Sequence, residues 1–169
     1  SWTNAGGITA NDSAVSLGGT FVTAGVGSIV NNNSNVHITG ALDNSAETLT
    51  LDGGTGSWRL TSGGSITGGT VDLTGGAELL IGGHSSNLLD GVTLNGDMRL
   101  DLGNSRVRWD GVTLNGTCFM TTTTSIGFVG SQTLNSGCTI DMDGTTGTKY
   151  LEMTTPGTLT VGAGAAIVG

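Results

Sequence analysis

The sequence predicts an all-β fold, a single-stranded parallel β-helix (β-solenoid) of about eight coils with about 20–22 residues each. One observation is an internal repeat: DGVTLNG begins at Asp90 and again at Asp110, and a related version begins at Val129. The other is the alternation of apolar and polar residues within each repeat, which sends side chains to opposite faces of a strand. A repeat this short has no room for a pair of helices.

Superposition of the repeats predicts columns of inward side chains. A slip by one residue would turn every apolar side chain outward, so the alternation specifies the pairing of neighbouring coils. Each strand is expected to lie about 4.8 Å from its copy in the next coil. The predicted inward columns are Leu94, Leu114 and Leu134; Leu100, Met120 and Ile140; and Met98, Cys118 and Cys138.

The coils before Asp90 follow the same pattern with a slightly longer and looser period. In the first strand of the coil, Leu49 aligns with Val71, and Val71 with Val92. The second strand of the coil gives two further aligned columns, which are Trp58, Leu79 and Leu100, and Leu60, Ile81 and Leu102.

No linker or change of composition divides residues 1–169, so they are predicted to form a single solenoid segment. Neither end carries the charged or amphipathic cap that normally covers a solenoid. The segment is therefore expected to be part of a longer array. The open coils at its two ends predict head-to-tail self-association.

Asn95, Asn115 and Asn135 form one more column, just after the last inward Leu of their strands. Stacked amides can form a hydrogen-bonded ladder along a fibre axis. Alternatively, Asn is used because it tolerates the left-handed conformation of an Asn-Gly turn. Both interpretations are structural and neither is catalytic.

Cys118 and Cys138 are expected to be stacked neighbours in the core. Two interpretations remain open: a disulfide between adjacent coils, or free thiols, which parallel stacked side chains favour because a disulfide needs a near-perpendicular torsion. No metal site is predicted, because His37 and His84 belong to distant coils and the chain has no Cys-x-x-Cys motif.

Two groups of charged residues are candidates for polysaccharide chemistry. Asp141 and Asp143 would project from the same side of a strand, as the acid and base of an inverting glycosidase require. Arg106 and Arg108 lie near stacked aspartates at Asp90 and Asp110. Catalytic pairs usually lie in clefts walled by long loops, whereas the predicted loops are short, and surface ion pairs are common. The sequence therefore predicts no catalytic residue and no cofactor.

Thr93, Thr113 and Thr133 form an outward column that could match a lattice such as ice. The aligned position in the preceding coil is Asp72, so this column is predicted to be short. Thr on a solvated strand is ordinary β propensity.

Composition excludes several classes of function. The chain has 32 Gly, one Pro and 4% aromatic residues, which suits a thin solenoid core better than a bulky globular one. Its net charge of -8 disfavours nucleic acid and anionic membranes as partners. No apolar run is long enough to span a bilayer, so no membrane insertion is predicted.

DGVTLNG at Asp90 and Asp110, with TLDGGTGSWRLTSGGSITGG before it and GTLTVGAGA after it, resembles the Gly/Thr/Asn-rich repeats of very large secreted bacterial surface proteins. These repeats are similar to filamentous-haemagglutinin and autotransporter passenger regions. The resemblance implies a right-handed parallel β-helix, secreted to the cell surface, with a structural role in an adhesin, stalk or filament. A glycan or another cell-surface ligand is an implied partner. The alternative function is a polysaccharide-binding or polysaccharide-degrading β-helix, including tailspike-like proteins.

Overall fold

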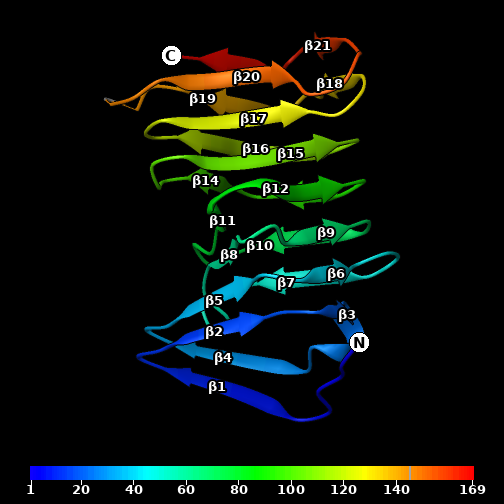
Figure 1. The fold of residues 1–169 in the computed structure, drawn as a ribbon, viewed down its shortest axis with the longest axis vertical. Coiled ribbons are helices and arrows are strands. Elements are labelled where there is room, and N and C mark those ends of the chain that lie inside the picture. The colour runs from blue at the N-terminus through cyan, green and yellow to red at the C-terminus, as the bar shows by residue number, and fades with distance from the viewer. Residues whose placement is uncertain (145) are drawn as a thin grey trace.

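The computed structural model describes residues 1–144 and 146–169 and shows a parallel β-solenoid. Its strands form about seven turns stacked along the long axis, from the N-terminal coil at one end to the C-terminal coil at the other (Figure 1). All strand pairs of the described residues are parallel, and the helical content there is one 3-10 turn at Thr23–Gly25. The predicted fold class is therefore confirmed.

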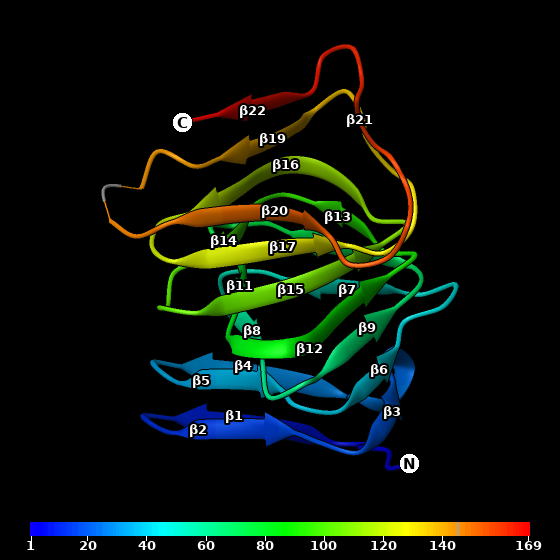
Figure 2. The same cartoon turned by 45° about the horizontal axis from the view of Figure 1, so that its top comes forward.

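Each coil contributes one strand to each of three faces. The tilted view of Figure 2 shows the coils as successive levels. The first face contains β1 (Gly7–Asn11), β4 (Ser28–Asn32), β7 (Thr48–Leu51), β10 (Thr70–Leu73), β13 (Thr93–Asn95), β18 (Gln132–Leu134) and β21 (Leu159–Val161). The second contains β2 (Ala14–Leu17), β5 (Asn35–Ile38), β8 (Trp58–Leu60), β11 (Leu79–Ile81), β14 (Met98–Leu100), β19 (Cys138–Asp141) and β22 (Ala166–Val168).

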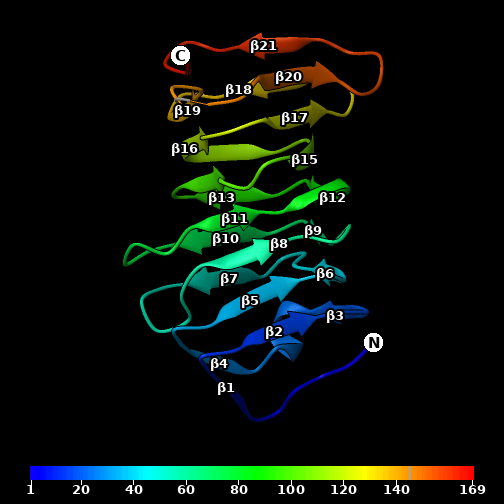
Figure 3. The ribbon, with the colours of Figure 1, turned by 60° about the vertical axis from the view of Figure 1, so that its left-hand side comes forward.

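The third face contains β3 (Thr20–Val22), β6 (Ala41–Asp43), β9 (Ser65–Thr67), β12 (Gly83–Asp90), β15 (Ser105–Asp110), β17 (Thr124–Phe128) and β20 (Lys149–Met153). Its seven strands are hydrogen-bonded in one continuous sheet. The long strand β16 (Thr113–Met120) runs from the first face onto the second without interruption. Figure 3 shows β2, β5, β8 and β11 of the second face following one another along the axis.

The core lies inside the coils and is narrow at each level. Alternate residues of each strand point inward, and these are almost all apolar and buried. Each coil therefore covers the apolar side chains of the next, which is how a thin solenoid core excludes water. One inward column of the second face runs through the stack as Val15, Val36, Trp58, Leu79, Met98, Cys118, Ile140 and Ile167.

Coil length varies more than the repeat predicts. On the first face, Val71 pairs with Leu94 and not with Val92, so this coil is longer than its alignment indicates. On the second face, Leu79 pairs with Met98 and not with Leu100, so the path between these two strands is shorter. The corners between faces take up these differences, because a turn can lengthen or shorten without moving the strands that it connects.

The pairing of β16 with β19 corrects two predicted columns. Cys118 pairs with Ile140, so Met120 is not the partner of Ile140. Cys138 pairs with Gly116, so the two cysteines are not at the same level of the column. Strand β16 rounds its corner as extended chain, whereas β18 and β19 are joined by a tight turn in which the Cys138 N–H donates to the Asn135 carbonyl. The tight turn takes up residues that the extended corner of β16 does not need. Strand β19 is therefore shifted by two residues relative to the partners that the repeat predicts.

The repeated Asp-Gly of DGVTLNG has a backbone reason. Gly91 and Gly111 both have φ of 61°, in the left-handed region that glycine adopts without steric cost. Each follows the last residue of a third-face strand, β12 or β15, and turns the chain toward the first face. The repeat motif is therefore a corner followed by a first-face strand.

Candidate functional site

Buried amide side chains tie neighbouring coils together from inside the corners. Asn87 accepts from the Gly63 N–H at 3.0 Å and donates to the carbonyls of Gly82 and Arg106, both at 3.0 Å, so it connects three successive coils. Asn44 likewise accepts from the Thr23 hydroxyl and donates toward the following coil. Satisfied buried amides of this kind fix the corner geometry, since an unpaired backbone group would be costly there.

Gln132 substitutes for backbone pairing between β16 and β18. Its amide accepts from the Val112 N–H at 3.1 Å and donates to the Val112 carbonyl at 2.7 Å. Gln132 is 5% exposed, so its amide is buried between the two coils and takes the place of a backbone partner for Val112. Leu114 and Leu134 are both buried on either side of this gap, although β18 forms its backbone ladder with β21.

The predicted asparagine ladder exists over part of its length. Asn115 donates to Asn95 at 2.8 Å, and Asn95 donates to Asp72 at 2.7 Å. None of the three predicted asparagines is among the left-handed residues, which removes the alternative interpretation. Asn135 makes no side-chain hydrogen bond to Asn115 and lies outside the ladder.

Cys118 and Cys138 are both buried and both free thiols. Burial, followed by the proximity of Cys138, raises the pKa of the Cys118 thiol well above its ordinary value. Burial raises the pKa of Cys138 to about 11. Thiols held in the protonated form are poor nucleophiles, so these cysteines fill space in the core.

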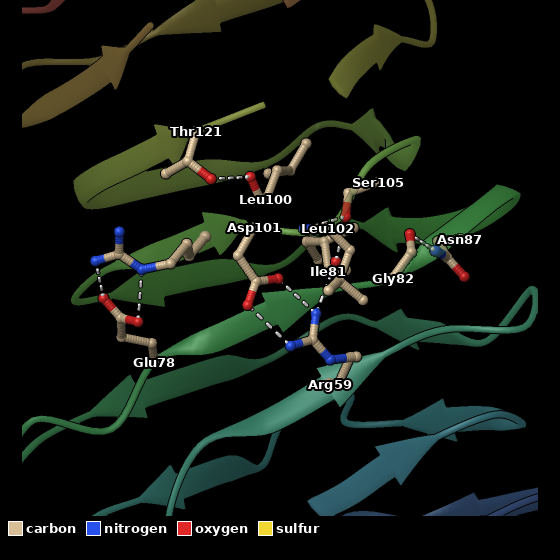
Figure 4. A network of polar contacts seen from close by, with 11 residues as sticks. Arg59, Glu78, Ile81, Gly82, Asn87, Leu100, Asp101, Leu102, Ser105 and Thr121 are labelled. Atoms are coloured by element: carbon tan, nitrogen blue, oxygen red, sulfur yellow. Dashed lines mark hydrogen bonds and ion pairs between the residues drawn. The ribbon is translucent and has the colours of Figure 1, made fainter. Parts of the chain in front are cut away.

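A network of arginines and carboxylates covers the second face (Figure 4). Arg59 makes two hydrogen bonds with Asp101, at 2.7 and 3.0 Å, across the intervening strand β11. Burial opposes ionisation of Asp101, but the hydrogen bonds and charge of Arg59 outweigh it and lower the pKa of that carboxyl. Arg99 holds Glu78 through contacts of 2.6 and 2.9 Å and stacks on the ring of Phe119.

The two candidate carboxylates are not on one strand, because Asp141 ends β19 and Asp143 lies beyond it in a local turn. The Asp143 N–H donates to the Asp141 carboxylate at 2.9 Å, and Asp141 lies between Phe119 and Val168 on the outer surface of the second face. His37 is on β5, whereas His84 is on β12. Among the described residues, no three His, Cys, Asp or Glu side chains are grouped to hold a metal ion.

The threonine column is longer than predicted and lies in a different register. Thr93 pairs with Thr113 and, on its other side, with Thr70, which in turn pairs with Thr48. Asp72 stacks on Asn95 instead. Thr133 pairs with Thr160 of β21, so it is outside this backbone ladder.

A polar groove crosses the third face over β17, which pairs with β15 on one side and with β20 on the other. Figures 1 and 2 show β15, β17 and β20 following one another in this order. The floor of the groove is Ser125 and Gly127, the outward residues of β17, both buried. A Cβ at Gly127 would lie 2.6 Å from the Thr154 methyl carbon, so a larger residue here would displace the Thr154 side chain and fill the floor of the groove. Two adjoining hollows of about 100 and 340 Å³ share Arg106, Ser125 and Glu152.

The two walls of this groove differ in charge. Arg106 and Arg108 form one wall, and Tyr150 and Glu152 form the other. Within residues 1–144 and 146–169 neither guanidinium has an ion-pair partner, and the Arg108 Nε atom is buried without an acceptor. Tyr150 is 51% exposed. The groove therefore offers unused donors, a carboxylate and an aromatic face to a ligand.

Sequence reasoning singled out Arg106 and Arg108 but favoured a surface ion pair for them, which is not formed among the described residues, and it missed the opposite wall. Arg106 and Arg108 stand out because they are outward residues of one strand in an acidic chain, and the predicted stacking of Asp90 on Asp110 beside them is correct. Tyr150 and Glu152 form the wall opposite the arginines, and the repeat does not predict their position because the turn before β20 is longer than in the other coils. Gln132 could have been recognised from the sequence, because the repeat aligns this polar residue with the apolar Val112.

Comparisons with protein-family models, curated proteins and solved structures find no match to this chain. In the described part of the chain, no helix has the length and hydrophobicity needed to cross a membrane.

Proposed function

We propose that this chain is a rigid β-solenoid segment of an extracellular bacterial surface protein, of the adhesin, stalk or filament type. The observation that carries the proposal is the unbroken inward column from Val15 to Ile167, which gives the stack a single continuous core. A core of this kind keeps its cross-section as coils are added, so length can grow without a new fold.

The side-chain hydrogen bonds that connect successive coils support a mechanical role. Asn44 and Asn87 each connect three coils, and Arg59 reaches Asp101 two coils away. Such contacts resist rotation and sliding of one coil against the next, in addition to the backbone ladders. The outward surface is rich in Thr, Ser and Asn, which keeps a long array hydrated.

Surface labelling of intact cells tests this proposal. An antibody raised against the folded chain should stain unpermeabilised cells that produce the protein, and external protease should remove the staining. A cytoplasmic protein in the same cells provides the control for leakage. Staining that requires permeabilisation would contradict an extracellular role.

A further inference from the structure

We propose that the groove between β15 and β20 binds a carboxylate-bearing pyranose, such as a uronic acid unit of a glycan. This inference goes beyond the scaffold function and stands on the groove alone. The first observation that supports it is which arginines are paired with carboxylates. Arg59 and Arg99 are paired with carboxylates, whereas Arg106 and Arg108 have no such partner among the described residues.

The spacing of the two unpaired arginines suits a single anionic group. They are alternate residues of one strand, so their Cα atoms are separated by roughly 6.6 Å and their side chains emerge on the same face. A guanidinium binds a carboxylate through two parallel N–H donors. Arg108 is only half-buried and its guanidinium has no carboxylate partner among the described residues, so a ligand carboxylate in the groove would supply one.

The opposite wall identifies the rest of the ligand as a sugar. Glu152 would repel a bare inorganic anion, but its carboxylate accepts hydrogen bonds from hydroxyl groups. Tyr150 presents an exposed ring, which provides a rigid apolar surface for the C–H face of a pyranose. A ligand that satisfies both walls therefore carries a negative charge, hydroxyl donors and a flat apolar face.

The size of the groove limits the ligand to a short unit. The larger hollow, about 340 Å³, is at the lower end of the range for small-molecule sites. Asn104, Thr123 and Ser125 line it and add polar partners for hydroxyl groups. Such a site binds one sugar residue with a Kd on the order of 1 mM, and several copies along an array would raise the avidity.

Tyr150 is the only tyrosine of the chain, so 3-fluorotyrosine labelling gives one fluorine NMR signal in the groove. Titration with methyl glucuronide should shift this signal saturably. Methyl glucoside, which has a neutral hydroxymethyl group in place of the carboxylate, and acetate, which lacks the ring, should each bind at least tenfold more weakly. Glucoside or acetate binding as tightly as glucuronide, or no saturable shift with glucuronide, would overturn the proposal.

Paired variants separate the groove from the overall charge. R106Q/R108Q should weaken glucuronide binding at least tenfold, because both guanidinium donors are lost. R59Q/R99Q changes the net charge equally on the second face and should bind as the native chain does. Loss of binding in R59Q/R99Q alone would contradict the assignment to the groove. If a variant does not fold, the three ligands on the native chain still decide the question, and none of these results bears on surface exposure of the chain.

Discussion

Neighbouring residues of one strand differ sharply in what they tolerate. Leu114 is 2% exposed inside the core, whereas Thr113 points outward and pairs with Thr93 of the adjacent coil. We expect Leu114→Asp to lower stability by several kcal/mol, because it buries a charge without a partner. Thr113→Asp should cost less than about 1 kcal/mol. Chemical denaturation of the two variants measures the difference, and equal losses would contradict the inside and outside assignment.

The buried thiols predict a loss of stability in alkali. An unfolded thiol ionises near 9.0, whereas the folded Cys138 thiol has a pKa of about 11. As pH rises from about 9 to 11, the unfolded state loses its proton first, so the free energy of unfolding falls across that window. Denaturation midpoints measured from pH 8 to 11 should decline less steeply in Cys138→Ala than in the native chain. Identical slopes would show that the thiol titrates normally in the folded state.

At the scale of elements, the inserted Gln132 side chain makes a testable junction. Gln132→Leu should leave the Val112 N–H and C=O buried without partners, at about 1–3 kcal/mol for each group. Thr133→Ala, at the exposed neighbouring position, is the matched control. Hydrogen exchange at the Val112 amide provides a local readout, and it should accelerate only in the Gln132 variant. Unchanged exchange would mean that the backbone finds another partner.

Alternation predicts which residues are inside more reliably than it predicts which residues are neighbours. Ile140 and Cys138 are buried as expected although their coil partners differ from the predicted ones, because a shift of two residues preserves the face. Leu102 aligns with Ile81 as an inward residue in the repeat, but it lies past the end of β14 and is largely exposed. Corner lengths decide these details, and they follow from turns and buried amides that a repeat period does not describe.

The candidate site illustrates the same limit. Arg106 and Arg108 are recognisable from sequence because their charge is unusual in this chain and the alternation places them outward. Glu152 faces Arg108 only because Gly127 lies between them in register, and the path from β17 to β20 is longer than the repeat predicts. A strictly regular period would have placed a different residue opposite the arginines.

At the scale of the whole stack, the described residues leave the core column uncovered at β22. Ile167 stacks on Ile140 from one side and is 39% exposed, and β22 has a strand neighbour only in β19 among the described residues. Unpaired strand edges and uncovered apolar side chains favour addition of another chain. The net charge of -8 opposes contact between copies of this polypeptide at low salt.

We therefore expect this polypeptide to associate end to end when salt screens its charge. Sedimentation across a concentration series should show larger species at about 0.15 M salt, where the screening length is about 8 Å, than at about 0.01 M, where it is about 30 Å. Ile167→Lys should abolish this association by placing a charge at the open end of the column. Leu102→Lys, which changes a similarly exposed apolar residue on the side of the stack, should leave it intact. If both variants associate equally, the contact involves the sides of the solenoid and not its axis.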